Sequence, residues 1–470
     1  MNAETDPALG VKDASPPTTA VPAAGRGGWP RATRRWLWRG LAAALLAWLL
    51  ATFVHQVVTG SYWLWGIPDP LPLLMFLAGP PVLLAAAAMP VLARSGLPRR
   101  DRMLISLSVA VLGVIVLHLL LAGSWLWVLP DLVPPLLYVL LPLALLVVVA
   151  VLRWRQMLER YAWWTVLVAS LATLGLGAGQ TGLNLAALTG AGAGPAPPGA
   201  VRVVSWDTLH WDTGGKPAQF YRFLTGQQAG IYLLQDYEHP AGGPQRPVDE
   251  AGLLRREFPG YHFASSGDLL TISRFPIVQW TAFETNPAPP PGTANIPFLK
   301  GWKYTILRTD ILIRGKLLSV YNVHFYDTFS LDVVPLSATF FRNVRALAQA
   351  RHDQFARLRA DITANPHPVL VSGNLNTLPG GTDLRLLGAL RDAARSSRSV
   401  YPATFAFIGP ALWRMDWTFT SHDVGAYQYS THGPQGLSSH SVQDMLVSLP
   451  SSRPDATSSH PDTSGSGAKP

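Results

Sequence analysis

Long apolar runs in the first 190 residues constrain the fold of this chain more than any other feature. A helix needs about 20 apolar residues to cross the hydrocarbon core of a bilayer. Only 14% of the residues are charged and 49% are hydrophobic, which favours a membrane protein over a wholly soluble one. We therefore predict an N-terminal all-α domain of five transmembrane helices within residues 31–188, with a buried helical bundle as the alternative. The predicted helices cover residues 36–58, 71–93, 103–123, 132–152 and 161–182.

Arginines are distributed asymmetrically around these runs. Twelve lie on the N-terminal arm and in the loops 94–102 and 153–160, whereas the loops 59–70 and 124–131 contain neither Lys nor Arg. Basic residues are enriched in cytoplasmic loops. The pattern predicts a cytoplasmic N terminus and, after five crossings, an extracytoplasmic C-terminal part.

A short repeat indicates how the membrane part is built. Trp63-Leu64-Trp65 followed by Pro68-Asp69 recurs as Trp125-Leu126-Trp127 followed by Pro130-Asp131. Each copy lies between an outgoing and a returning run, so we infer a duplicated helical hairpin. Tryptophan is favoured at membrane interfaces, and we interpret this domain as an anchor. We predict a disordered cytoplasmic arm at 1–30, a Gly/Pro linker at 189–200 and a disordered tail at 451–470.

Residues 201–450 have a different pattern. Apolar runs of four to seven residues, bounded by Gly, Pro or Asp, predict buried strands. They alternate with amphipathic stretches at 217–228 and 340–364 that predict helices, which indicates an α/β layered domain. Polar side chains follow the strands, where a rigid scaffold commonly presents chemistry. The predicted strands are 201–206, 230–235, 317–323, 367–372 and 417–420, and the polar residues are Asp207, Asp236, His324, Asn374 and Asn376.

Six motifs occur in order in this region. Their order and spacing resemble the endonuclease/exonuclease/phosphatase superfamily, which includes DNase-I-like nucleases, sphingomyelinases and inositol-phosphate phosphatases. The resemblance implies a DNase-I-like four-layer sandwich over residues 201–450, metal-dependent phosphoester hydrolysis and an architecture like that of bacterial membrane members with an outward-facing domain. The motifs are S-W-D at 205–207, L-L-Q-D at 233–236, N-V-H at 322–324, S-G-N-L-N at 372–376, R-M-D at 414–416 and S-S-H at 438–440.

The resemblance also implies roles for individual residues. A divalent cation, Mg²⁺ in most of the family, is expected on Asp236 together with Asp207. Asp207 and Ser439 are also expected at the substrate or behind the residues that contact it. Asp416 is expected to orient His440 beside the phosphate. The catalytic set carried over from the motifs is His324, Asn374, Asn376, Asp416 and His440.

Four positions depart from the usual motifs. Asp207 replaces Asn, Asp236 replaces Glu, and Asn374 and Ser439 each replace Asp. An amide at position 374 cannot accept a proton, and general-base help is typically worth about 10²–10⁴-fold in rate. Asp207 adds one carboxylate back. One hypothesis is therefore that charge has been exchanged between positions 207 and 374.

Two functions remain open at this point. The first is a membrane-anchored extracytoplasmic phosphoesterase, in a bacterial-type cell membrane, that acts on an envelope or lipid-linked phosphate. The second is a pseudoenzyme that binds a phosphorylated ligand or partner without turnover. A nucleic-acid partner is disfavoured, because residues 201–450 hold 22 Lys/Arg against 19 Asp/Glu and no basic cluster.

Overall fold

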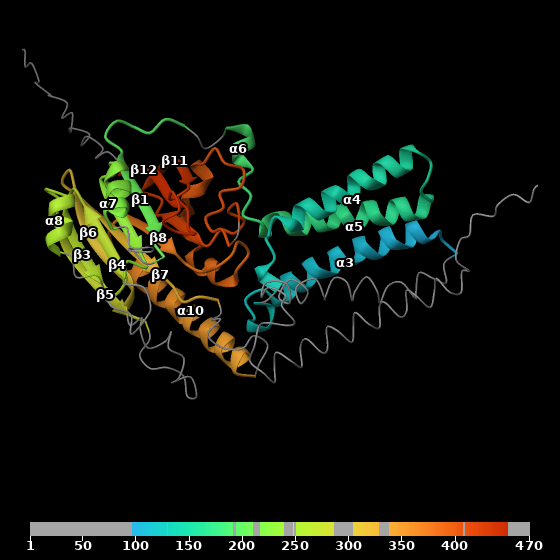
Figure 1. Ribbon diagram of the computed structural model, residues 1–470, viewed down its shortest axis with the longest axis horizontal. Coiled ribbons are helices and arrows are strands. Elements are labelled where there is room, and N and C mark those ends of the chain that lie inside the picture. Colours follow the sequence, from blue (N-terminus) through green and yellow to red (C-terminus); the bar gives the residue numbers. More distant parts are fainter. Residues whose placement is uncertain are drawn as a thin grey trace, which may run out of the picture. The chain divides into compact units, whose positions relative to one another are not determined.

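The computed structural model of the protein contains apolar helices followed by an α/β domain (Figure 1). It describes residues 96–128, 130–190, 194–209, 217–238, 248, 251–285, 304–328, 338–407 and 409–449. The predicted arm at 1–30, the first two apolar runs, the first copy of the tryptophan repeat and the tail at 451–470 lie outside these residues.

Three apolar helices precede the α/β domain. They are α3 (Arg99–Leu121), α4 (Leu137–Trp154) and α5 (Arg160–Gly177). By length and composition, each of them could cross a membrane, with the third extended by a short 3-10 turn to Gln180. Exposed apolar side chains such as Val147 and Val168 cover their outer surfaces. Among the described residues, the last three of the five predicted membrane helices are therefore present as helices.

Helix α4 begins later than the apolar run that predicted it. The run starts at residue 132, but Pro134 and Pro135 have no backbone N–H to donate within a helix, and α4 starts at Leu137. Helices α3 and α5 begin, and α4 ends, at an arginine-containing loop, so Arg99, Arg153 and Arg160 belong to the same end of the three helices. The second copy of the tryptophan repeat belongs to the other end.

The α/β domain contains two six-stranded sheets (Figure 1). Each has a central parallel pair, β1 with β2 and β7 with β8, and every other pairing is antiparallel. The first sheet has the order β11 (Gly425–His432), β12 (Val442–Ser448), β1 (Val201–Asp207), β2 (Ile231–Gln235), β4 (Leu269–Ser273), β3 (His262–Ser266). The second has the order β5 (Ile277–Glu284), β6 (Tyr304–Ile313), β7 (Lys316–His324), β8 (Val369–Asn374), β10 (Asp416–Thr420), β9 (Arg391–Asp392).

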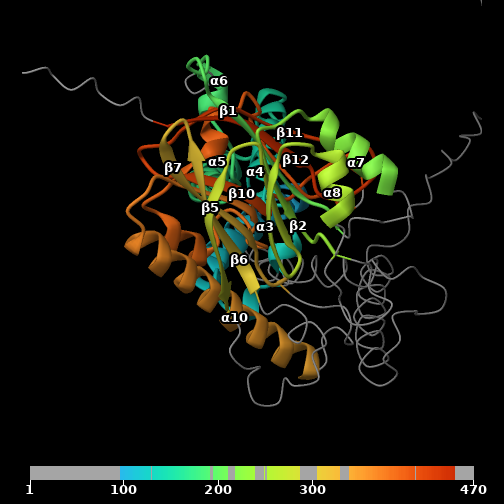
Figure 2. The same ribbon diagram turned by 90° about the vertical axis from the view of Figure 1, so that its left-hand side faces the viewer.

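Helices cover the outer faces of both sheets. Phe220 of α7 (Pro217–Gly226) and Leu254 of α8 (Ala251–Glu257) pack in one core against the first sheet. Phe355 and Leu358 of α10 (Ala338–Ala364) pack in another core against the second sheet. Figure 2 shows α10 on the opposite side of the strands from α7 and α8. Short elements complete the described chain: α6 (Ala186–Thr189) and 3-10 turns at Trp125–Trp127, Pro130–Leu132, Thr382–Leu387 and Ala393–Ser396.

A third core lies between the sheets. Val203 and Leu233 of the first sheet meet Val320 and Leu370 of the second. The layers are therefore helix, sheet, sheet and helix, which confirms the two-sheet DNase-I-like α/β fold predicted for the C-terminal domain.

Candidate active site

The strand alternation directs the site residues into the space between the sheets. On β1, Val204 and Trp206 face the helices α7 and α8, whereas Val201 and Val203 face the other sheet. Successive side chains point to opposite faces of a sheet, so Asp207 points toward the second sheet. The same alternation on β7, β8 and β10 directs His324, Asn374 and Asp416 inward.

The strand directions bring these residues to one edge. Strands β1 and β2 are parallel, as are β7 and β8, so both pairs end at the same edge of their sheets. Antiparallel β10 and β12 begin at that edge, with Asp416 opposite Asn374 and with His440 just before β12. Residues far apart in the chain thus meet because of the topology.

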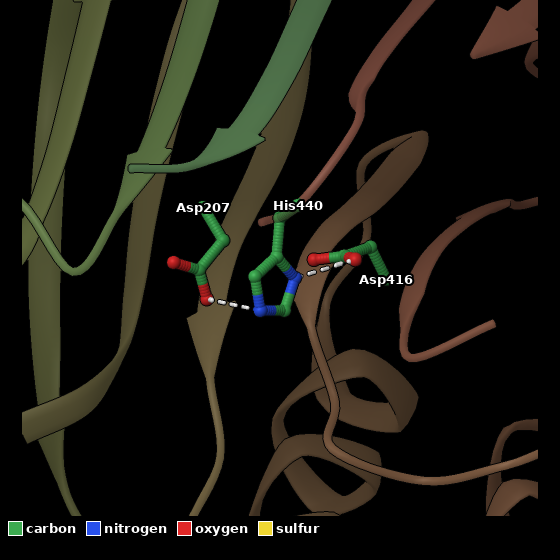
Figure 3. A group of neighbouring side chains, drawn as sticks. All are labelled: Asp207, Asp416 and His440. Carbon is green, nitrogen blue, oxygen red and sulfur yellow. Dashed lines mark hydrogen bonds and ion pairs between the residues drawn. The ribbon is translucent and has the colours of Figure 1, made fainter. Parts of the chain in front are cut away.

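His440 is held between two carboxylates (Figure 3). Its Nδ1 lies 2.9 Å from Oδ2 of Asp416, which is the pairing expected from the sequence, and its Nε2 lies 4.0 Å from Oδ2 of Asp207. Burial disfavours the charged imidazole, but Asp416 and Asp207 outweigh it and raise the pKa of His440 to about 9. The ring also packs on Phe405, with 4.8 Å between ring centroids. The imidazole is therefore fixed in position and cationic at neutral pH.

His324 has an equivalent arrangement. Its Nδ1 lies 2.5 Å from Oδ2 of Asp268, and its Nε2 lies 3.6 Å from the same Asp207 oxygen that faces His440. Burial again opposes the charge, but Asp268 and Asp207 raise the pKa of His324 to about 10. Sequence analysis missed Asp268. It directly precedes β4, which is antiparallel to β2, and only this pairing reveals that it lies at the site edge.

Asp207 is the point where these groups converge. It is 2% exposed, and its Oδ2 accepts a hydrogen bond of 2.8 Å from Nδ2 of Asn374. Its Oδ1 accepts one of 3.0 Å from the backbone of Leu209. Burial acts to raise its pKa, but the two imidazoles and these hydrogen bonds lower it below the ordinary value. Asp207 is thus an ionised carboxylate shared by both histidines.

The two asparagines of the S-G-N-L-N motif belong to one chain of hydrogen bonds. Oδ1 of Asn374 accepts from the backbone N–H of Asn376 at 2.9 Å. Nδ2 of Asn376 donates to Oδ1 of Asp327, also at 2.9 Å. Sequence analysis missed Asp327, although it follows His324 by only three residues. Burial and the charge of Asp207 raise the pKa of Asp327 against the opposing charges of His324 and His440, so its carboxyl group lies within electrostatic range of the site.

Ser439 contributes through its backbone. Its carbonyl accepts a hydrogen bond of 3.0 Å from the N–H of Ala406, and this bond connects the loop before His440 to the segment that carries Phe405. The neighbouring Ser438 Oγ donates to the carbonyl of Asp207 at 2.8 Å. The S-S-H segment therefore attaches His440 to the end of β1.

Two buried groups could hold a metal ion. One is Asp236, Asp268 and His324, and the other is Asp207, Asp416 and His440; within each group the ligand atoms lie within 4.8 Å of one another. In the first group, burial and the charge of Asp207 raise the pKa of Asp236 well above its ordinary range. A divalent cation would relieve this crowding of carboxylates, whose hard oxygens suit Mg²⁺, Mn²⁺ or Ca²⁺. In the second group the two imidazoles outweigh burial and lower the pKa of Asp207, so its charge is already offset and this is the poorer metal site.

A profile of the Endonuclease/Exonuclease/phosphatase family matches residues 204–451, more than half of the chain. The chain belongs to this family. Members of the endonuclease/exonuclease/phosphatase family are generally hydrolases that depend on divalent cations, and the buried acidic groups described above fit that chemistry.

Several solved structures are similar to part of the chain. An endonuclease/exonuclease/phosphatase from Bacteroides vulgatus is 15% identical, over 53% of this chain and 99% of its own, with a TM-score of 0.38. A family protein from Leptotrichia buccalis is 12% identical, over 53% of this chain and 100% of its own, with a TM-score of 0.39. The mannosyl-6-phosphatase of Bacteroides thetaiotaomicron is 14% identical, over 53% of this chain and 100% of its own, with a TM-score of 0.37. No match among curated proteins was found.

Proposed function

We propose that this protein is a membrane-anchored, extracytoplasmic phosphoesterase that hydrolyses an envelope or lipid-linked phosphate ester with the help of a divalent cation. The observation that carries the proposal is the convergence of two carboxylate-held imidazoles on one oxygen of Asp207. His324 Nε2 and His440 Nε2 approach that oxygen to 3.6 Å and 4.0 Å. Buried cationic imidazoles at fixed positions are suited to binding a phosphoryl group and to stabilising charge that develops on it.

The residues divide into two functions under this proposal. Asp236 and Asp268, the two carboxylates of the first group, would hold the cation, which when bound supplies charge stabilisation for the phosphoryl oxygens, while the cationic His324 faces the phosphoryl group. His440 donates a hydrogen bond from Nε2 toward the phosphoryl group or the leaving oxygen, because Asp416 fixes the Nδ1 proton on its other side. Phe405 shields one face of this imidazole from water.

The membrane location rests on charge and chain path. Arginines mark one end of α3, α4 and α5, and the chain leaves α5 from the opposite end. With basic residues on the cytoplasmic side, the α/β domain would lie outside. Residues 181–200, between the last apolar helix and β1, can span at most roughly 70 Å when extended, which would tether the site to the bilayer and favours a substrate that is itself at the membrane.

A second function is favoured by one observation. At position 374 the amide presents its Nδ2 to Asp207, so this side chain has no oxygen available to accept a proton from water. A pseudoenzyme that binds a phosphorylated ligand through His324 and His440, without turnover, would be consistent with that arrangement.

The test uses the full chain in detergent micelles with bis(4-nitrophenyl) phosphate and 4-nitrophenyl phosphate as probes. We expect turnover that requires Mg²⁺, Mn²⁺ or Ca²⁺, that EDTA abolishes, and that His440→Ala lowers by at least about 100-fold. His432→Ala is the matched control, because His432, the last residue of β11, pairs with Gln227 and not with a residue of the site. Binding of inorganic phosphate without turnover of either probe, lost in His440→Ala, would instead establish the pseudoenzyme.

A further inference from the structure

We propose that Asp207 is the catalytic carboxylate of this enzyme, and that its role has moved across the site from position 374 to position 207. This inference rests on the proposed function. The usual family motifs place an amide at the end of the first strand and a carboxylate in the S-G-N-L-N motif, and this chain has the reverse. Asp207 and Asn374 face one another across the two sheets, with 2.8 Å between Oδ2 and Nδ2.

The direction of the hydrogen bond defines the exchange. Asp207 can only accept, so Asn374 must present its NH₂ group, and the Oδ1 of Asn374 accepts from the backbone of Asn376 at 2.9 Å. Both ends of the amide are therefore committed. Position 374 acts as a donor that orients a carboxylate, and position 207 is the carboxylate that it orients.

The surroundings of Asp207 are those of a reacting group. Its Oδ2 faces Nε2 of His324 at 3.6 Å and Nε2 of His440 at 4.0 Å, which are distances of ion pairs rather than of direct hydrogen bonds. Each histidine has its own second carboxylate, Asp268 or Asp416, on Nδ1. Asp207 is thus not needed to fix either ring, and its Oδ2 faces both of the Nε2 atoms that would contact a phosphoryl group.

The step assigned to Asp207 is proton acceptance from the attacking water. The water oxygen bonds to phosphorus, and the phosphorus–oxygen bond to the leaving group breaks. One water proton passes to the carboxylate of Asp207, and the leaving alkoxide takes a proton from the imidazolium of His440. Asp207 and His440 exchange the proton afterwards across the 4.0 Å gap through water, which returns both to their starting states.

Two explanations for the amide at position 374 predict opposite results for one variant. Either the catalytic carboxylate has moved to position 207, or it has simply been lost. If Asn374 merely lost a catalytic group, Asn374→Asp would raise turnover. If the carboxylate has moved, Asn374→Asp sets a second carboxylate 2.8 Å from Asp207, and two such groups cannot both ionise. We therefore expect Asn374→Asp to lower kcat by at least about 10-fold.

The experiment measures kcat, KM and Mn²⁺ affinity for the full chain in micelles, with bis(4-nitrophenyl) phosphate as the probe. Asp207→Asn should lower kcat by at least about 100-fold with little change in KM. The kcat of the double variant Asp207→Asn/Asn374→Asp should recover to within about 10-fold of wild type. The effects of the two substitutions on kcat would then be strongly non-additive. Asp361→Asn/Asn365→Asp is the matched control, because both residues form hydrogen bonds with the hydroxyl of Tyr321. The kcat of this double variant should stay unchanged.

Each outcome has a distinct meaning. A wild-type chain that turns over no probe in the presence of metal overturns the proposed function, and this inference with it. An active wild type with Asp207→Asn at the wild-type kcat, or with Asn374→Asp faster than wild type, overturns this inference alone. So does an Asp207→Asn variant whose lost activity is restored by raised Mn²⁺, because Asp207 would then be a metal ligand. Melting temperatures of all variants identify any that fail to fold.

Discussion

At the scale of single residues, each histidine of the site depends on a carboxylate at its Nδ1. Asp416 and Asp268 occupy Nδ1 of His440 and His324, and so leave Nε2 directed at Asp207. Such a partner fixes both the tautomer and the orientation of an imidazole. Asp236 and Asn376 also adopt left-handed backbone conformations, with φ of 53° and 46°. Non-glycine residues in that region store strain of order 1 kcal/mol or more, and it concentrates at functional sites.

Removal of the charge on Asp416 should change the pH dependence of activity. His440 has a pKa raised to about 9, so its imidazolium persists from acid pH up to about pH 9 and is lost above it. Asp416→Asn removes the largest favourable effect on that charge, so the pKa falls and the alkaline limb of kcat/KM moves to lower pH. The measurement is kcat/KM from pH 5 to 10 with Mg²⁺. Asp361→Asn, on α10, should leave the limb in place, and an unmoved limb in Asp416→Asn would mean that His440 does not act as a cation.

At the scale of secondary structure, most of the site could be predicted because it lies at strand ends. The apolar runs before Asp207, Asp236 and His324 are short and clearly bounded, and β1, β2 and β7 end within a residue of their predicted limits. Asp268 could not be found in this way, since its place depends on the register of Leu234 opposite Leu270 rather than on any local pattern. Long-range pairing leaves no signal in a single sequence window.

Gly373 illustrates how an element constrains the site. It has φ of 147°, and a Cβ at this position would collide with the carbonyl oxygen of Val323 on the parallel strand β7. We expect Gly373→Ala to push β7 and β8 apart, to lower the free energy of unfolding by about 3 kcal/mol or more, and to misplace His324 and Asn374. Chemical denaturation of the full chain in micelles measures the change.

The control for this variant isolates the backbone strain. Gly260 has φ of 79° with open space around a Cβ, so Gly260→Ala should lower stability by only about 1 kcal/mol. If the two alanine variants are equally stable, the close approach of β7 and β8 at Gly373 does not control stability.

At the scale of the whole molecule, the chain combines helices that could cross a membrane with a family domain that has little net charge of its own. The arginines that make the chain basic flank the apolar runs, and residues 201–450 carry a net charge of only +3, from 22 basic and 19 acidic residues. The positive charge therefore follows the apolar runs rather than the family domain. Sequence analysis predicted this division, because both signals are compositional and do not require knowledge of packing.

The topology itself can be tested with single cysteines. The chain has no cysteine, so an introduced thiol is the only one in the protein. Ala364, at the end of α10, and Met157, between α4 and α5, are both exposed. With arginines on the cytoplasmic side, Ala364→Cys should react with a membrane-impermeant maleimide in intact cells, whereas Met157→Cys should react only after the membrane is opened. Mass spectrometry of the purified chain measures the labelled fraction. Labelling of Met157→Cys but not Ala364→Cys in intact cells would place the site in the cytoplasm and remove envelope phosphates as substrates, while leaving the chemistry proposed for Asp207 and His440 intact.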